Sequence, residues 1–525
     1  MLPKPPFACD VTLEQELEAF EQLKPRLSEV WNVLTASSDA PGTSVIVPSL
    51  TLDTEELTKL TGASYYEERL LLLLIRLRNP RAHVVYVTSQ PVHPLILDYY
   101  LHLLAGVPAS HARARLTMLC VHDASPRPLT QKILERPRLL QRIRYAVPDP
   151  TQAYLTVFNA TPLERTLSVL LGIPLNGLDP SLAHLGTKSG SRRVFREAGI
   201  DMPAGVEDVK TPEDVAEALM DLRHQRPAMR RALIKLNDSF SGEGNALVLC
   251  PEAIDRSALR RAVDRAVMPV PTERPAQYFD KLKRMGGVVE EFVEAPFKES
   301  PSAQFRTSPN REVLEVSTHD QILGGDSGQI YLGCTFPARE EYRQAIRDAG
   351  ARVGHVLASY GVVSRYGVDF LASRHAPDEP WQLTALEINL RVLGTTHPFL
   401  ALRFLTGGEL DPATGQFLSL SQRAKCYRAT DNLRSERYRG LLPEDLLDIV
   451  SMHGLHYSHR TESGALFHMI GAMSQFGKLG LTVIGNDTSE VNELYERAIH
   501  VLEAEATLGH EPSGHTCAAT HKLVL

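Results

Sequence analysis

Alternating apolar and polar residues mark a hairpin in the second half of the chain. The sequence LTALEINLR (383–391) alternates as a half-buried strand does, which places Glu387, Asn389 and Arg391 on one face. The apolar run GVDFL (367–371) predicts a partner strand that carries Asp369. A hairpin across the loop at 375–380 would bring the three oxygen-bearing side chains together, beside a guanidinium.

The first third of the chain predicts a parallel sheet. Apolar runs typical of buried strands occur at 44–50, 83–89, 116–121 and 153–159. Helical patterns occur at 11–35, 65–78 and 94–104. This order predicts βαβ units and an α/β fold with right-handed crossovers. No glycine-rich loop follows any of these strands, which argues against a dinucleotide site.

Two lysines in the middle of the chain stand at the ends of predicted elements. Lys188 precedes a helix that ends at Gly199, where glycine is a common stop signal. Lys235 ends a predicted strand at 232–236 and comes directly before a loop of small residues, which include Ser239, Ser241, Gly242 and Gly244. Such a loop lets backbone N–H groups approach a phosphate. Surface lysines and a simple glycine-turn hairpin are the alternatives.

The hairpin side chains suit a hard cation. Asp369, Glu387 and Asn389 offer the oxygen ligands that Mg²⁺ prefers, with Mn²⁺ as a substitute. Arg391 next to such a metal is the arrangement that phosphoryl transfer requires. Polar residues on the solvated face of an antiparallel pair are the alternative for the D…E-x-N pattern alone.

Composition limits the partners and the location. The 525 residues predict two or three domains, and 43% hydrophobic and 23% charged residues are typical of a globular protein. A net charge of −7 gives no field that favours nucleic acid or an anionic membrane. No segment has the length or composition of a signal peptide or a membrane span. Six scattered cysteines indicate free thiols, so we expect a cytoplasmic protein, and a homodimer is compatible with the sequence.

In this order the motifs resemble the ATP-grasp superfamily. The resemblance implies Asp369, Glu387 and Asn389 as Mg²⁺ ligands and Arg391 as a contact to the γ-phosphate or acyl phosphate. It implies Lys188 and Lys235 as the lysines that bind ATP phosphates. The sequence GGVVEEFVEAP (286–296) resembles the superfamily's adenine-binding hinge, and the match carries over to Glu290, Glu291 and Val293, with Phe292 as apolar lining. Glu294 and Glu299 remain alternatives for the acid that holds the ribose.

Several further segments resemble the pheganomycin-type peptide ligases, over about residues 43–504. These segments are VPSL, GTKSGSRRVFREAGI, LRFLTGGELD, YRATDNL and GALFHMIGAMSQFGKLGLTVIGND. The resemblance implies an N-terminal helix with a Rossmann-like pre-ATP-grasp domain at 1–175, an ATP-grasp domain at 176–430 and a small α+β domain at 431–508. The tail at 509–525 is expected to be disordered, as chain ends commonly are. It implies an ATP- and Mg²⁺-dependent enzyme that joins a small-molecule carboxylate to an amine or peptide through an acyl phosphate.

Polar residues at 302–321 predict substrate contacts. Ser302, Gln304 and Arg306 alternate, so they share one face of a strand. We expect Arg306 to hold the donor carboxylate and Asp320 to orient an ammonium group, with an exposed hairpin as the alternative. Two other functions remain open: a kinase that phosphorylates a hydroxyl, and a non-catalytic nucleotide-binding regulator.

Overall fold

Five parallel strands form the first sheet of the computed structural model, which describes residues 12–238, 244–252, 254–268, 273–324 and 330–508. Their spatial order is β3-β2-β1-β4-β5, and they are β1 (Gly42–Val47), β2 (Ala82–Thr88), β3 (Leu116–Cys120), β4 (Ala153–Val157) and β5 (Leu175–Asn176). In β1, Val45 packs in one hydrophobic cluster and Ile46 in another. The sheet is therefore covered on both faces, as the unbroken apolar runs predicted.

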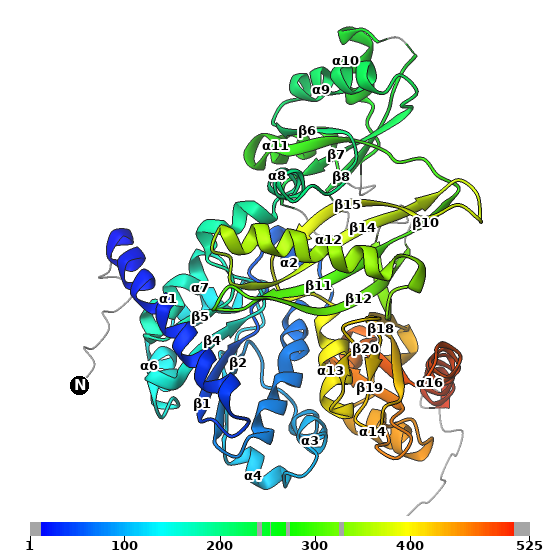
Figure 1. Cartoon of the computed structure of the whole chain (residues 1–525). Coiled ribbons are helices and arrows are strands. Elements are labelled where there is room, and N and C mark those ends of the chain that lie inside the picture. The colour runs from blue at the N-terminus through cyan, green and yellow to red at the C-terminus, as the bar shows by residue number, and fades with distance from the viewer. Residues whose placement is uncertain (1–11, 239–243, 253, 269–272, 325–329, 509–525) are drawn as a thin grey trace, which may run out of the picture.

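Helices surround this sheet (Figure 1). They are α1 (Leu13–Ala36), α2 (Thr54–Lys59), η1 (Ala63–Arg78), α3 (Pro94–His102), α4 (Ala109–Arg113), α5 (Leu129–Leu134), α6 (Pro137–Tyr145), η2 (Pro150–Gln152) and α7 (Pro162–Leu171). The segment predicted as a helix at 65–78 is helical, but as a long 3₁₀ helix. Its run of leucines from Leu70 to Leu74 is buried over the whole length.

A small antiparallel sheet stands apart at the top of Figure 1. Its order is β6-β9-β7-β8, formed by β6 (Gly205–Val209), β9 (Gly287–Glu291), β7 (Arg231–Leu236) and β8 (Asn245–Leu249). Its helices are η3 (Pro180–Gly186), α8 (Lys188–Ala198), α9 (Pro212–Gln225), α10 (Arg256–Asp264) and α11 (Pro275–Met285). Thr211 caps α9. Gly199, in the left-handed conformation, ends α8, as predicted. We call this part the small lobe.

The largest sheet has eleven strands among the described residues and forms the centre of the molecule. The order runs β10-β14-β11-β12-β13-β18-β17-β16, and β15 pairs with β14. The strands are β10 (Phe297–Glu299), β11 (Pro301–Thr307), β12 (Val313–Gly324), β13 (Ile330–Phe336), β14 (Ser364–Arg374), β15 (Gln382–Asn389), β16 (Glu409–Leu410), β17 (Phe417–Leu418) and β18 (Ala424–Arg434). Helix α12 (Glu340–Ser359) packs on one face, and α13 (Thr396–Thr406) follows β15.

The C-terminal part joins this sheet rather than forming a separate one. Strand β18 pairs with β13 on one side and with β20 (Lys478–Gly485) on the other, and β19 (Gly464–His468) pairs with β20. The helices here are η4 (Glu436–Tyr438), α14 (Pro443–Met452), η5 (Ile470–Ala472), α15 (Met473–Phe476) and α16 (Thr488–Leu508). The domain boundaries at 175/176 and 430/431 stay a prediction.

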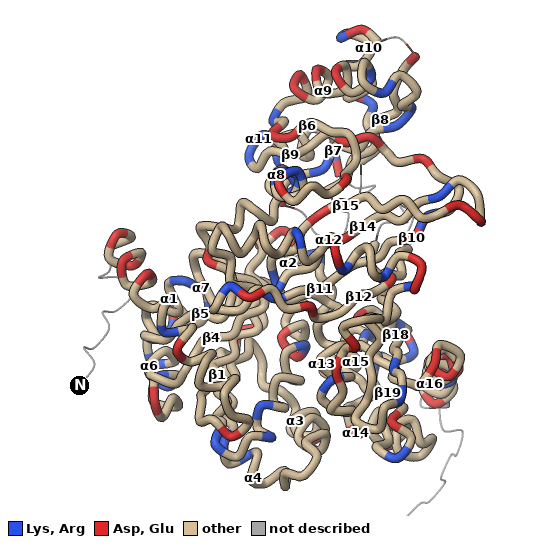
Figure 2. The backbone as a smooth tube through the Cα atoms, viewed as in Figure 1, with Lys and Arg blue, Asp and Glu red and all other residues tan. Residues whose placement is uncertain are grey.

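Strand β19 covers only part of an apolar run. The run continues from Leu466 to Met473, but β19 ends at His468 because Met469 adopts a left-handed backbone with φ of 53° and η5 begins at Ile470. Apolar character alone does not separate a strand from a buried helical turn. In the described residues, no helix is long and apolar enough to cross a membrane. Positive and negative side chains are interspersed over all parts of the chain (Figure 2).

Candidate active site

The predicted hairpin of β14 and β15 exists, and it brings the three oxygen-bearing side chains together. The register places Asp369 opposite Glu387 and Gly367 opposite Asn389. Asn389 Nδ2 donates to Asp369 Oδ2 at 3.0 Å and to Glu387 Oε1 at 3.0 Å. Rotation of the amide by 180° would present Oδ1 in the same place. Two carboxylates and one amide oxygen form a donor set that fits Mg²⁺.

This donor set is small. The described residues contain no group of three or more His, Cys, Asp or Glu side chains that could hold a metal. Mg²⁺ usually keeps several waters and completes its shell with substrate phosphates, so two carboxylates suffice for a site that forms with the nucleotide. Gln321 Nε2 on β12 donates to Asp369 Oδ1 at 2.9 Å, which fixes that carboxylate. Burial raises the pKa of Asp369.

Arg391 lies at the end of this cluster. Its Nη2 donates to Asn389 Oδ1 at 2.9 Å. Burial lowers the pKa of Arg391, although the nearby Asp369 opposes that shift. The predicted cation therefore does stand beside the predicted ligands.

Lys188 reaches the cluster from the small lobe. It is the first residue of α8, its backbone N–H donates to Asn237 O at 3.2 Å, and its ammonium contacts Glu387. Ser191 Oγ, one turn along α8, accepts from the Ile388 N–H at 3.0 Å and holds the helix against β15. Burial, together with the nearby Lys235, lowers the pKa of Lys188 to about 8. Two like charges in one buried place are typical of a polyanion site.

Lys235 and Glu290 form a buried ion pair with a third partner. Lys235 Nζ lies 2.5 Å from Glu290 Oε2, and Arg192 Nη1 donates to Glu290 Oε1 at 2.9 Å. Glu290 is 2% exposed and Lys235 is 7% exposed. Burial alone would raise the pKa of Glu290, but the two cations outweigh it and lower the pKa. The trio carries one net positive charge.

The other predicted hinge residues lie near this trio. Glu291 ends β9 and accepts from the Ala204 N–H at 3.2 Å, and Val293, two residues on, is half-buried. Of the two alternatives for the ribose, Glu294 pairs with Arg231. The other, Glu299, belongs to β10 and lies 2.8 Å from Arg339. The choice between them remains open.

The loop of small residues is only partly described. Ser239, Ser241 and Gly242 lie outside the described residues. The Gly244 carbonyl accepts from the Leu236 N–H at 3.1 Å and from Tyr278 Oη at 2.9 Å, so it closes the β7–β8 hairpin.

The polar residues at 302–321, predicted to contact substrates, divide between different places of the central sheet. Ser302, rather than Arg306, stands opposite Asp369, while Arg306 stands opposite Arg365 four residues away along the strand. Asp320 faces the other side of the sheet, where its oxygens accept from Tyr342 Oη at 2.6 Å and the Arg339 N–H at 3.0 Å. Side chains alternate along β12, so Gln321 rather than Asp320 shares a face with Asp369, and a role of Asp320 in orienting an ammonium group stays a prediction.

Sequence reasoning missed Arg192 and Asn237. Arg192 is 3% exposed on the inner face of α8, whereas its neighbour Arg193 is exposed. Asn237 follows Lys235 and its Oδ1 accepts from the Ser189 N–H at 2.9 Å, which ties β7 to the start of α8. The helical period would have placed Arg192 one turn after Lys188 on the same face.

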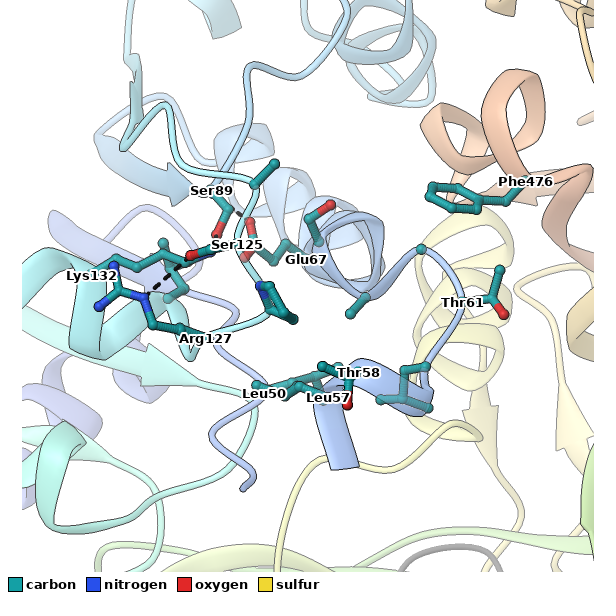
Figure 3. Close-up of a pocket in the computed structure, with 17 residues that line it drawn as sticks. Leu50, Leu57, Thr58, Thr61, Glu67, Ser89, Ser125, Arg127, Lys132 and Phe476 are labelled. Carbon is teal, nitrogen blue, oxygen red and sulfur yellow. Dashed lines mark hydrogen bonds between the residues drawn. The ribbon is translucent and has the colours of Figure 1, made fainter. Parts of the chain in front are cut away.

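A cavity of about 380 Å³ lies outside the carboxyl ends of β1, β2 and β3 (Figure 3). Glu67, Ser89 and Lys132 line one side, and Phe476 of the C-terminal part lies on the other. Glu67 Oε2 accepts from the Ser89 N–H at 2.5 Å, and Lys132 Nζ donates to Ser89 Oγ at 3.0 Å. Burial raises the pKa of Glu67 to about 7.

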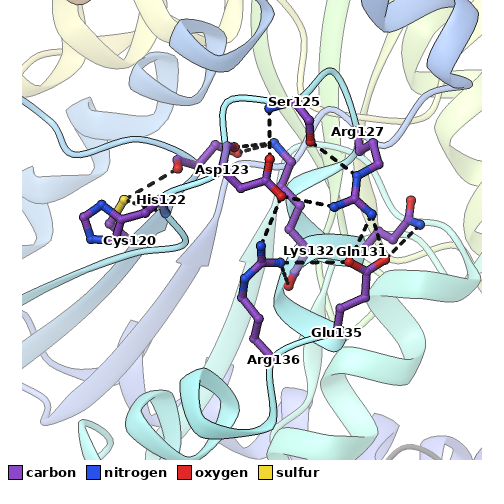
Figure 4. A network of polar contacts seen from close by, with 10 residues as sticks. Cys120, His122, Asp123, Ser125, Arg127, Gln131, Lys132, Glu135 and Arg136 are labelled. Carbon is purple, nitrogen blue, oxygen red and sulfur yellow. Dashed lines mark hydrogen bonds and ion pairs between the residues drawn. The ribbon is translucent and has the colours of Figure 1, made fainter.

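Lys132 also belongs to a network of hydrogen bonds and ion pairs around Asp123 (Figure 4). Lys132 is 1% exposed and donates to Asp123 O at 2.8 Å. Arg127 and Arg136 each lie 3.1 Å from Asp123 Oδ2.

Comparison with known proteins identifies the fold. Two protein families match parts of the chain: "PGM1 C-terminal domain" over residues 445–498 and "IQCH-like, ATP-grasp" over residues 180–261. A biotin carboxylase from Campylobacter jejuni, solved as a β,γ-ATP complex, has a TM-score of 0.54 at 11% identity and covers 90% of this chain and 95% of its own. The ADP complex of purK, N5-carboxyaminoimidazole ribonucleotide synthetase, has a TM-score of 0.51 at 13% identity and covers 89% and 98%.

Two curated proteins are similar in sequence. L-propargylglycine–L-glutamate ligase of Streptantibioticus cattleyicolor is 32% identical over 473 residues, which are 89% of this chain and 95% of that enzyme. IQ motif-containing protein H of Danio rerio is 25% identical over 450 residues, which are 77% of this chain but 42% of that larger protein. The fold is thus the ATP-grasp fold that the sequence predicted, and the chain belongs to the ATP-grasp carboxylate–amine ligases, in the family of L-propargylglycine–L-glutamate ligase.

Proposed function

We propose that this protein is a peptide ligase of the pheganomycin type, which uses ATP and Mg²⁺ to join the carboxylate of one amino acid or peptide to the amine of another. The observation that carries the proposal is the group of cations at the Asp369–Glu387–Asn389 cluster: Lys188 and Arg391 contact its side chains, and Lys235 lies near Lys188. The named substrates of the 32% identical relative are two amino acids, and the match to the PGM1 C-terminal domain supports the pheganomycin type.

The proposed reaction has two steps. A substrate carboxylate oxygen attacks the γ-phosphorus of ATP, ADP leaves, and the product is an acyl phosphate. The amine of the second substrate then attacks the carbonyl carbon, phosphate leaves with the bonding electrons, and the nitrogen gives up a proton. Mg²⁺, held by Asp369, Glu387 and Asn389, would neutralise charge on the phosphates. Arg391 beside Asn389 is placed to stabilise the negative charge that develops during transfer.

The lysines would bind the phosphates of ATP and exchange partners when they do so. In the described structure Lys188 contacts Glu387 and Lys235 contacts Glu290. A polyanion that entered between them would compete with both carboxylates, which favours phosphates of high charge over weaker anions. The loop at 239–245 would cover the phosphates, and Glu290, Glu291 and Val293 would form the adenine side of the site.

The proposal also keeps the division into a pre-ATP-grasp domain at 1–175, an ATP-grasp domain at 176–430 and a C-terminal domain at 431–508. The continuous sheet through β13, β18 and β20 supports a C-terminal part that folds together with the ATP-grasp domain.

An ADP-release screen tests the function. The purified chain would be supplied with ATP, Mg²⁺ and pairs of amino acids, which include L-propargylglycine with L-glutamate, and with short peptides as acceptors. We expect ADP release that requires both substrates and an amide product of the corresponding mass. Hydroxylamine in place of the amine should yield a hydroxamate, because an acyl phosphate reacts with it.

The alternatives give different results. A phosphorylated hydroxyl product without hydroxamate would identify a kinase. ATP binding without ADP release from any pair over hours would leave a nucleotide-binding regulator and refute the ligase.

A further inference from the structure

A second cavity, of about 70 Å³, lies between the first sheet and the central sheet, and four arginines line it. We call it the arginine cavity. Arg76 comes from η1, Arg306 from β11 and Arg365 from β14. Residues that follow β4 and β5 also line the cavity, and the fourth arginine is Arg391, which contacts Asn389 as well. None of the described residues that line it is acidic.

The side chains that accept hydrogen bonds from Arg76 and Arg306 are neutral. Arg306 Nη2 donates to Asn176 Oδ1 at 3.0 Å, and its guanidinium lies 4.1 Å from the centre of the Trp31 ring. Arg76 Nη1 donates to Thr156 Oγ1 at 3.3 Å and to Ser44 Oγ. Arg365 has no hydrogen bond or ion pair from its guanidinium within the described part of the chain.

The charges therefore repel without compensation. Burial and the neighbouring arginines lower the pKa of Arg306 to about 9, and burial with Arg76 lowers the pKa of Arg365 to about 10. Partly buried charges are normally paired, and arginine forks match carboxylate and phosphate oxygens. An anion in the arginine cavity would remove this repulsion.

The position of the cavity separates its anion from the reacting one. Ser302, Gln304 and Arg306 share a strand face, opposite Asp369, Gly367 and Arg365 respectively. One face of the sheet thus runs from the predicted metal ligands to the arginines. Four residues of β14 separate Asp369 from Arg365, which is about 13 Å along the strand. A carboxylate that reacts beside Asp369 is a different group from one held by Arg76, Arg306 and Arg365 at the far end of this face, and Arg391 lies between the two places.

We propose that the arginine cavity binds a substrate carboxylate that does not react, namely the free carboxylate of the amino acid or peptide that supplies the amine. The inference rests on the proposed ligase function. The volume suits one small anionic group, comparable to about two waters at roughly 30 Å³ each, and the substrate body would extend toward Arg391. Such an anchor would direct the amine toward the metal end of the sheet face and explain three convergent guanidiniums.

A binding experiment tests the cavity without any turnover. The thermal unfolding midpoint is measured with sodium acetate and with sodium chloride at equal ionic strength, for wild type, Arg365→Met and Arg403→Met. Arg403 is the matched control because it is exposed, neighbours Arg365 and does not line the cavity. Acetate should raise the midpoint of wild type and Arg403→Met by about 2 °C over chloride, and should have no such effect on Arg365→Met.

The same experiment contains a second comparison. Without acetate, Arg365→Met should unfold at the wild-type temperature or above it, because the substitution removes repulsion and breaks no ion pair. A lower midpoint for Arg365→Met together with an equal response of all three proteins to acetate would overturn the anion site.

Kinetics identify the source of the carboxylate. For wild type, the KM of an acceptor amino acid is compared with the KM of its carboxamide. The KM of the carboxamide should be about 10-fold higher or more, while the KM for ATP stays the same. In Arg365→Met the two acceptors should have the same KM. If Arg365→Met instead abolishes a preference for donors with two carboxylates over donors with one, the anchored carboxylate belongs to the donor and the acceptor assignment is overturned.

Two failures are distinguishable. If no pair of substrates releases ADP, the ligase proposal fails, while the acetate comparison still reports on the cavity. If ligation occurs and neither the acceptor nor the donor preference depends on Arg365, the anchor proposal fails and the ligase stands.

Discussion

Loss of the Glu290 carboxylate should deprive Lys235 of its ion-pair partner and leave Arg192 paired with Glu207 alone, and Glu290→Gln measures the cost. Glu290 is 2% exposed, accepts from Arg192 at 2.9 Å and lies 2.5 Å from Lys235 Nζ. A hydrogen bond to a charged group contributes about 1.5–3 kcal/mol. Breaking a buried ion pair by removing one partner costs about 3–5 kcal/mol. Because the Gln amide oxygen can still accept from one cation, we expect a loss of about 2–3 kcal/mol of unfolding free energy.

A matched control lies four residues away. Glu294 pairs with Arg231 at 2.6 Å, but both side chains are more than one-third exposed. Exposed pairs contribute about 0–1 kcal/mol, so Glu294→Gln should change stability little.

Urea unfolding measures the global effect, and hydrogen exchange of the amides in β7 and β9 measures the local one, since a multidomain chain need not unfold in one step. In a double-mutant cycle with Lys235→Met, Glu290→Gln should lower the unfolding free energy by less, because the cation that would lose its ion-pair partner is already absent. If Glu290→Gln and Glu294→Gln prove equal within about 0.5 kcal/mol, the buried trio does not exist as described.

Three other predictions concern the metal ligands, a phosphate lysine and a buried acid. Asp369→Ala and Glu387→Ala should each abolish ADP release while circular dichroism stays native, since these half-buried carboxylates add little to the core; near-normal turnover would place the metal elsewhere. Lys235→Ala should weaken ATP binding about 10- to 150-fold in calorimetry, the equivalent of about 1.5–3 kcal/mol for a charge-assisted hydrogen bond, and unchanged affinity would exclude a phosphate contact. Burial raises the pKa of Glu67 to about 7 from 4.5, so its contribution to stability is full below pH 4.5 and falls as the pH rises through 7. Glu67→Gln should flatten this decline in unfolding midpoints between pH 5 and 8, whereas the exposed Glu18→Gln should not.

The hairpin of β14 and β15 could be predicted because its information is local. The two-residue period of β15 fixes which side chains share a face, and the loop at 375–380 is short enough to force antiparallel pairing with β14. Lys188 and Lys235 were predictable for a similar reason, since each stands at the boundary of an element that has its own signals.

Other features depend on contacts between distant segments. The period along β12 alone cannot say which of Asp320 and Gln321 faces the metal, because that depends on which face α12 covers. Arg192 and Arg193 are adjacent residues of the same type, and only the packing of α8 decides that Arg192 faces Glu290 of β9 while Arg193 contacts Asp208. The arginine cavity joins η1, β11 and β14, which no single stretch of sequence brings together.

The sharing of β18 between two parts of the molecule affects how the chain can be cut. Truncation after β18 would leave its β20 side as an open edge, with seven residue pairs of the native ladder unmade. Open edges template intermolecular pairing, so such a fragment should aggregate rather than persist as a working ATP-grasp core. The same truncation would remove two contacts to the N-terminal part of the chain. Phe476 would no longer line the cavity beside Glu67, and Glu68 would lose the hydrogen bond that it accepts from the Gly471 N–H. Any screen for a minimal enzyme should therefore keep residues through α16 and trim the chain elsewhere.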